Sequence, residues 1–250
     1  MRIVVVGGTG LIGARVVTRL RGLGHDAMAA ARATGVDSFT ADGLEAALDG
    51  AQTLIDVSNS SYFDEAGAEE FFYTSTLNLL TYGAAAGVSH HVVLSVVGTD
   101  RLARSEGGYF RAKAAQERLV VESGRAYSFV HATQFYEFVR SIIEEATREG
   151  VTRVADALFQ PMAADDVAAA VVATALGDPV NGVGEFAGPE VFSLQEMAKR
   201  ELRLRDDDRE VTADPLGTYF GARLERRELL PGPGATLSTQ TFHDWRVANG

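Results

Sequence analysis

The sequence predicts an α/β fold built on a doubly wound parallel sheet, and three observations lead to this prediction. Short apolar segments typical of buried strands alternate along the chain with segments of helical length. A cluster of glycines follows the first apolar segment directly. The chain has 250 residues, of which 46% are hydrophobic, and this is enough to bury one large core.

The expected elements follow one another without an internal repeat or a long linker. Strands are expected over 2–6, 26–31, 36–39, 53–57, 91–96, 126–131 and 184–187. Helices are expected over 11–22, 42–48, 66–86, 108–123, 136–148, 165–176, 193–204 and 214–223. The composition changes near residue 181, where Gly-Pro turns begin. We expect this last third to lie over one edge of the sheet, above the C-terminal ends of the strands.

Composition excludes several function classes. The net charge of −11 disfavours nucleic acid as a partner, because its phosphates would repel the protein. We expect no membrane partner, since no stretch approaches the ~20 apolar residues that span a bilayer, and no signal peptide, since the first strand begins at residue 2.

The chain has no cysteine, which excludes disulfides, a cysteine nucleophile and cysteine-ligated metal, and suits a cytoplasmic enzyme. Its five histidines lack metal-ligand spacing, so we expect no metal site. The adjacent His90 and His91 are expected to face solvent at the entry of a strand.

The glycine cluster, Gly7-Gly8-Thr9-Gly10-Leu11-Ile12-Gly13, lies between the first strand and the first helix. Gly7 and Gly10 permit a sharp turn and a close approach of a pyrophosphate, and Gly13 lets the helix pack close to the strand. The N–H groups at the helix start attract phosphates, together with the helix dipole. We therefore expect dinucleotide contacts from this segment, at Gly7, Thr9, Gly10, Leu11, Ile12 and Gly13. The alternative is an ordinary βα turn without a ligand.

This motif makes the predicted sheet a Rossmann-type fold, and the small C-terminal region expected over its strand ends is the expected substrate-binding region. Residues 1–134 are expected to form the dinucleotide-binding core. Residues 135–250 are expected to supply the remaining core strand and helices and the substrate-binding region, within a single integrated domain.

Arg32 points to NADP(H) rather than NAD(H). A strand-end Asp or Glu usually binds the ribose 2′-hydroxyl of NAD, but here Asp26 begins the second strand and Arg32 follows its end. Arg32 can pair with a 2′-phosphate, or it can be one more surface arginine. Asp42 either faces the adenine or caps the next helix. Val57 and Ser58, after the fourth strand, either contact the cofactor or simply start a loop.

A second group of residues carries the expected chemistry. Tyr109 and Lys113 are four positions apart on a predicted helix and share one face, and Ser95 ends a strong strand. In a ketone reductase the tyrosine gives the oxygen its proton, and a nearby ammonium lowers the phenol pKa from about 10. The lysine can also hold the nicotinamide ribose, and the serine can orient the carbonyl.

This spacing would arise by chance about 5% of the time in a chain with two lysines and seven tyrosines. The alternative is a tyrosine packed on a helix face beside a solvated lysine. The strand-end position of Ser95 favours the functional interpretation.

Four segments together resemble an atypical short-chain dehydrogenase/reductase, and the NmrA-like, NAD(P)H-binding branch is the most similar. They are the glycine motif, Leu94-Ser95-Val96-Val97-Gly98-Thr99-Asp100, Tyr109-Phe110-Arg111-Ala112-Lys113 and Gln160-Pro161-Met162-Ala163-Ala164-Asp165-Asp166-Val167. The resemblance implies a Rossmann domain with a small substrate region, NADP(H) as the ligand, and catalytic positions at Ser95, Tyr109 and Lys113. His131 stands where members often carry arginine, and it either touches the substrate or fills the space of that arginine.

Aromatic residues after the sixth core strand indicate an apolar substrate pocket, with Phe135 and Tyr136 as its expected lining, unless they only build the core of the small region. The sequence therefore predicts an NADPH-dependent reductase of a carbonyl or conjugated group on an apolar small molecule. Two alternatives remain open. One is an NADP(H)-binding redox sensor of a protein partner, and the other is an epimerase or dehydratase on the same fold.

Overall fold

The computed structural model describes residues 1–60, 65–104, 108–219 and 222–249, and its centre is a parallel sheet. The seven strands of this sheet lie in the order β14-β9-β5-β4-β3-β1-β2, and every neighbouring pair is parallel. They are β1 (Arg2–Val6), β2 (Asp26–Ala30), β3 (Thr53–Asp56), β4 (His90–Val96), β5 (Tyr127–Ala132), β9 (Val183–Ala187) and β14 (Thr236–Leu237). The predicted doubly wound α/β fold is confirmed.

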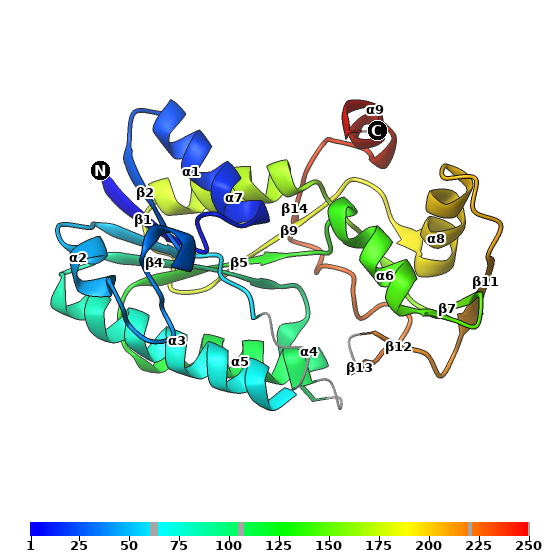
Figure 1. Ribbon diagram of the computed structural model, residues 1–250, viewed down its shortest axis with the longest axis horizontal. Coiled ribbons are helices and arrows are strands. Elements are labelled where there is room, and N and C mark those ends of the chain that lie inside the picture. Colours follow the sequence, from blue (N-terminus) through cyan, green and yellow to red (C-terminus); the bar gives the residue numbers. More distant parts are fainter. Residues whose placement is uncertain (61–64, 105–107, 220–221, 250) are drawn as a thin grey trace.

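Helices cover both faces of the sheet, as Figure 1 shows. One face carries α1 (Leu11–Gly22) and α7 (Ala164–Leu176), which pack against each other. The other carries α3 (Glu65–Ala85) and α5 (Gly108–Glu122), with the short α2 (Leu44–Leu48) beside α3. Alternate residues of β1 pack into the hydrophobic cores on opposite faces of the sheet. Ile3 and Val5 pack toward α1, and Val4 and Val6 pack toward α2. A strand buried on both faces therefore reads as a continuous apolar run.

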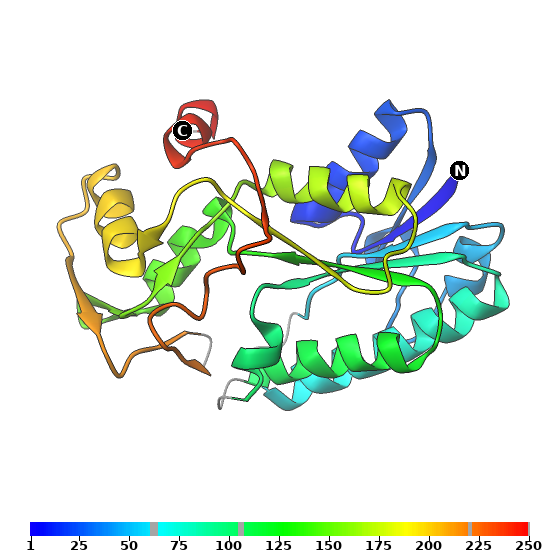
Figure 2. The same ribbon diagram turned by 180° about the vertical axis from the view of Figure 1, so that it is seen from behind.

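A smaller C-terminal lobe continues from β5 at one end of the sheet and has a hydrophobic core of its own (Figures 1 and 2). Its helices are η2 (Tyr136–Phe138), α6 (Val139–Glu145), α8 (Leu194–Arg203) and α9 (Phe242–Asn249). Its strands are β6 (Thr147–Arg148), β7 (Val151–Ala155), β8 (Leu158–Phe159), β10 (Phe192–Ser193), β11 (Glu210–Asp214), β12 (Thr218–Tyr219) and β13 (Ala222–Arg223). The remaining short elements are η1 (Arg32–Thr34) after β2 and α4 (Thr99–Leu102) after β4. Because β9 and β14 are strands of the central sheet and α7 covers it, the second half of the chain contributes to both the sheet and the C-terminal lobe.

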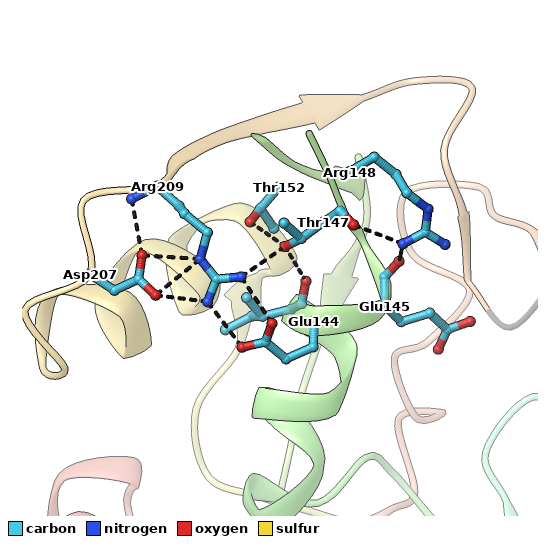
Figure 3. Close-up of polar contacts among 8 residues, drawn as sticks. Glu144, Glu145, Thr147, Arg148, Thr152, Asp207 and Arg209 are labelled. Atoms are coloured by element: carbon cyan, nitrogen blue, oxygen red, sulfur yellow. Dashed lines mark hydrogen bonds and ion pairs between the residues drawn. The ribbon is translucent and has the colours of Figure 1, made fainter. Parts of the chain in front are cut away.

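Arg209 connects the start of β11 to α6 in this lobe (Figure 3). Its two terminal nitrogens donate to the two carboxylate oxygens of Glu144, each at 2.9 Å, and its Nε donates to Asp207. The guanidinium holds the pKa of Glu144 and that of Asp207 below their usual ranges. This paired arrangement fixes the loop that leads into β11 against α6.

Three predicted elements differ in the structure. Residues 36–39 form a turn rather than a strand, because Asp37 Oδ1 accepts from the Phe39 N–H at 2.8 Å. The described part of the helix expected over 214–223 is instead a turn, in which the N–H of Gly217 donates to Asp214 O at 2.9 Å, followed by strand residues of β12 and β13. Residues 220–221 of that expected helix lie outside the described residues. The helix expected over 136–148 stops at Glu145, and the chain turns into the β6–β7 hairpin.

His90 and His91 do not face solvent, as the sequence analysis expected, since each is only 4% exposed. Both enter the sheet on β4, a central strand. His90 Nε2 lies 2.9 Å from Ser128 Oγ. Burial lowers the pKa of His91 to about 4, with Asp56 opposing the shift and His90 adding to it.

Candidate functional site

The glycine loop packs so tightly that side chains would not fit in it. Gly7 has a left-handed φ of +76°, and a Cβ there would lie 2.9 Å from the backbone of Ser58. A Cβ on Gly13 would lie 2.1 Å from the carbonyl oxygen of Gly7. By contrast, a Cβ on Gly10 would meet only Gly7 O, at 3.3 Å. The loop is therefore closed toward β3 and α1 and open at Gly10, the N-cap of α1.

The start of α1 has the properties of an anion-binding position. No side chain caps this helix, and its first turn holds no acidic residue. Among the described residues, the backbone N–H groups of Leu11 and Ile12 have no acceptor. The side chain of Ile12 is buried in the core and Thr9 is exposed, so Ile12 presents its backbone and Thr9 its side chain. Free N–H groups and the helix dipole together favour a phosphate here.

The other predicted cofactor residues lie around the same edge of the sheet. Val57 and Ser58 follow β3 and are half-buried, with the Val57 N–H donating to Val6 O at 3.0 Å. Arg32 begins η1 after β2, whose Ala30 carbonyl accepts from the N–H of Gly7, so the Arg32 backbone lies near the loop. Arg32 is exposed, and no ion-pair partner is found for it within the described ranges. Asp42 is exposed and accepts from Thr40 Oγ1 at 2.8 Å; it does not cap α2, because the N-cap is Gly43.

Tyr109 lies at the junction of the sheet and the C-terminal lobe. Its ring packs against the lobe core and also against a cluster of Ala68, Phe72 and Ala112 between α3 and α5. Its hydroxyl donates to Asn59 Oδ1 at 3.3 Å, and Asn59 follows Ser58 in the segment after β3. The phenol therefore reaches the edge of the sheet that holds the glycine loop. Burial raises the pKa of Tyr109 to about 12, which corrects the sequence expectation of a lowered value.

Lys113 lies one turn further along α5 and is only 3% exposed. Its ammonium donates to Leu94 O at 2.9 Å and to the side-chain oxygen of Gln116, and it lies 4.7 Å from the centre of the Phe72 ring. Gln116 in turn donates to Asp56 Oδ2 at 2.9 Å. Burial lowers the pKa of Lys113, and the carboxylates of Asp56 and Glu117 oppose that shift. In this arrangement the ammonium connects α5 to β4.

Ser95 and His131 occupy paired positions on the neighbouring strands β4 and β5. Ser95 Oγ donates a hydrogen bond to Glu117 Oε1 and lies 3.4 Å from Thr99 Oγ1. His131 Nε2 lies 3.0 Å from the same Glu117 oxygen, an ion-pair distance when the ring is protonated. The structure therefore brings two predicted site residues together around a carboxylate.

Glu117, which lies beside both Ser95 and His131, is absent from the sequence predictions. It follows Lys113 by four positions, as Lys113 follows Tyr109, so all three share one face of α5. That continued four-residue spacing is the signal that could have identified it.

The two aromatic residues expected in the substrate pocket have different surroundings. Tyr136 is 2% exposed, and its ring packs edge-on against Phe242 in the lobe core, which favours a packing role. Phe135 is half-buried and stacks on the exposed Phe138, with ring centres 5.4 Å apart. Phe135 and Phe138 leave an apolar surface just after β5.

The fold resembles those of solved nucleotide-dependent enzymes. The structure of MoeE5 in complex with UDP-glucose and NAD matches with a TM-score of 0.70 and 18% identity, over 96% of this chain and 90% of that chain. UDP-glucose 4-epimerase of Thermus thermophilus in complex with NAD matches with a TM-score of 0.67 and 17% identity, over 100% of this chain and 93% of that chain. An NADPH-dependent quinone oxidoreductase of Escherichia coli complexed with NADPH matches with a TM-score of 0.64 and 20% identity, over 86% of this chain and 78% of that chain.

No protein-family model and no curated protein matches the sequence. At these identities the structural matches show a common Rossmann-type fold, in which ligands bind at the C-terminal ends of the strands. The described ranges contain no group of three acidic or histidine residues that could hold a metal ion. They also contain no helix of the length and apolar character needed to cross a membrane.

Proposed function

We propose that the protein is an NADPH-dependent reductase of a carbonyl or conjugated group on an apolar small molecule. The observation that carries this proposal is the Tyr109–Asn59 hydrogen bond of 3.3 Å. It holds the phenol at the edge of the sheet where Gly7 packs on Ser58, with Lys113 one helical turn away. A proton donor beside a dinucleotide cradle is what a hydride-transfer reductase needs.

The residues at the edge of the sheet fit a dinucleotide phosphate. Free backbone N–H groups at the start of α1 would hold the pyrophosphate, and Gly10 leaves room for it. Arg32 would pair with a 2′-phosphate, which is the reason to propose NADPH over NADH. Val57 and Ser58 would line the side of the cofactor nearest β3, and Asp42 the adenine side.

When bound, NADPH supplies the hydride that adds to the carbonyl carbon. Tyr109 then gives its hydroxyl proton to the carbonyl oxygen, and the product is an alcohol. Because burial raises the pKa of Tyr109 to about 12, the phenol keeps its proton at neutral pH. The alkoxide that forms is a stronger base than a phenolate, so this proton transfer is favourable. Lys113 lies one helical turn from the phenolate left behind, and Ser95 would contact the substrate oxygen.

An apolar substrate is supported by the apolar surroundings of the Tyr109 ring and by the apolar surface after β5. Phe72 and Phe110 pack edge-on against Tyr109, with ring centres 6.1 and 5.5 Å away. Phe135, with the exposed Phe138 stacked on it, adds apolar surface after β5. Phe72 and Phe110 are buried, so the partly exposed Phe135 and Phe138 would be the rings that contact a flat, apolar carbonyl compound.

The Tyr109→Phe variant tests the proposal, with phenanthrenequinone as a general apolar carbonyl probe. We expect kcat to fall by about 100-fold or more, because the variant lacks the proton donor. NADPH affinity, measured by nicotinamide fluorescence, should not change. Unchanged turnover in Tyr109→Phe would refute the assigned role. The matched control is Tyr73→Phe, which removes a hydroxyl from an exposed tyrosine of α3.

The second candidate is an epimerase or dehydratase, which the resemblance to UDP-glucose 4-epimerase favours. In both reactions hydride leaves the substrate and can return to it, so no reduced product accumulates. NADPH carrying deuterium at the transferred position separates the two candidates. Deuterium in a reduced product supports the reductase, whereas isomerised product without deuterium supports the alternative.

A further inference from the structure

One carboxylate oxygen of Glu117 lies beside both Ser95 and His131. Ser95 comes from β4 and His131 from β5, and both approach the same carboxylate oxygen, Oε1. The carboxylate itself comes from α5, which covers that face of the sheet. Its side chain is 16% exposed, against 8% for His131. A mostly buried carboxylate is unfavourable unless a donor or a positive charge lies beside it. Ser95 supplies a hydrogen bond, whereas His131 Nε2 lies at ion-pair distance without making one.

The hydrogen on Ser95 has one destination in this arrangement. A serine hydroxyl has a single hydrogen, and here it is donated to Glu117. The neighbouring Thr99 donates its own hydroxyl hydrogen to Val96 O at 2.7 Å, so Thr99 does not fix the Ser95 rotamer by donation. Glu117 is therefore the group that sets the direction of the Ser95 O–H bond.

His131 lies beside the carboxylate oxygen that Ser95 would leave on contact with a substrate. To contact a carbonyl oxygen, Ser95 must turn its hydrogen from Glu117 to the substrate. The carboxylate would then lose a donor, but His131 Nε2 is still 3.0 Å from the same oxygen. A positive charge on the His131 ring at that distance would offset part of the loss of the Ser95 hydrogen bond.

We propose that Glu117 is a positioning residue of the reductase site, which holds the Ser95 side chain in place for the substrate, with His131 at ion-pair distance from the same carboxylate. This inference rests on the proposed function and extends it to two residues, Glu117 and His131. Glu117 touches neither the substrate nor the cofactor in this role.

The test compares Glu117→Gln and Glu117→Leu with the wild-type protein, using NADPH and phenanthrenequinone. Gln keeps the shape and one oxygen acceptor, whereas Leu has no acceptor. We expect kcat to fall by about tenfold or more in Glu117→Leu and by less in Glu117→Gln, since misplacement of a reacting group is costly. The dissociation constant of NADPH should stay within about twofold, because Glu117 acts on Ser95 and not on the cofactor.

A double variant tells positioning apart from a general structural effect. In the Ser95→Ala background, Glu117→Leu should reduce kcat no further, because the hydroxyl that it positions is already absent. Glu122→Gln, on the exposed part of the same helix, is the matched control and should leave kcat unchanged. Circular dichroism verifies that each variant is folded.

Three outcomes would overturn the inference: normal kcat in Glu117→Leu, an equal loss in the presence and absence of Ser95, or a loss explained entirely by weaker NADPH binding. Each of these leaves the reductase proposal intact when the wild-type protein turns over. A wild-type protein that binds NADPH but reduces no carbonyl probe would overturn both.

Discussion

Gly13 rests against Gly7 so closely that a Cβ on Gly13 would lie 2.1 Å from the Gly7 carbonyl oxygen. The first turn of α1 therefore sits directly on the end of β1. This contact aims the N–H groups of that turn at the space over Gly10, where a phosphate would lie.

Replacement of Gly13 by Ala should damage both stability and cofactor binding. The neighbouring atom is a backbone oxygen, so the helix must shift to admit a methyl group. We expect unfolding free energy to fall by about 1–3 kcal/mol, as for overpacked cores, and NADPH affinity to fall with it. Denaturant titration and nicotinamide fluorescence measure these two effects.

Gly22→Ala provides the matched control in the same helix. A Cβ on Gly22 would meet nothing within 4 Å, and alanine is the better helix former. Stability should stay the same or rise, and NADPH should bind normally. Wild-type affinity in Gly13→Ala would mean that the close packing of α1 does not serve the cofactor.

Arg32 should determine the choice between NADPH and NADH. Replacement by Ala removes the guanidinium that would pair with the 2′-phosphate, and a charge-assisted hydrogen bond contributes about 1.5–3 kcal/mol. The affinity for NADPH should therefore fall by about tenfold or more, while NADH, which lacks the phosphate, binds as before. Isothermal titration with both nucleotides gives the ratio, and an equal loss for both would contradict the assignment.

The sequence was most informative where structure is local. The apolar run of β1 and the glycines after it are decided by neighbouring residues, and the structure has both as predicted. Some lobe strands were missed because long-range pairing creates them: β11 pairs with β7, which lies more than 50 residues earlier in the chain. Strands as short as Thr218–Tyr219 have no periodicity of their own.

At the site, the sequence predicted the position of residues better than their contacts. Tyr109 and Lys113 share a helix face, which four-residue spacing decides. The buried state of Lys113 depends on Leu94, Gln116 and Phe72, which come from three different elements. The direction of the Tyr109 pKa shift depends likewise on packing against the lobe, and no local pattern encodes that packing.

The Arg209 network should contribute to the stability of the C-terminal lobe. Arg209→Lys keeps the charge but loses the paired contact with both Glu144 oxygens. We expect a modest decrease of the melting temperature at low salt and a smaller one at high salt, because ions screen exposed pairs. Arg203→Lys, at an exposed position of α8, is the control. A decrease that does not depend on salt would indicate lost packing rather than lost ion pairing.

The buried His91 should make the protein sensitive to acid. Its pKa is lowered in the folded state from 6.5 to about 4, so the unfolded chain binds a proton more readily. The stability from this group is therefore complete above pH 6.5 and is lost as the pH falls from 6.5 through about 4. A shift of this size corresponds to up to about 3 kcal/mol. Urea unfolding at a series of pH values measures the loss.

His91→Gln separates this effect from the titration of the carboxylates. The variant cannot take up the proton, so the difference in unfolding free energy between the variant and the wild type should change across that pH window and stay constant above it. His243→Gln removes an exposed histidine and should keep the wild-type pH dependence. Because burial also lowers the pKa of His90, His91→Gln should retain part of the acid sensitivity. If the two curves ran parallel down to pH values near 4, His91 would not be a source of acid sensitivity.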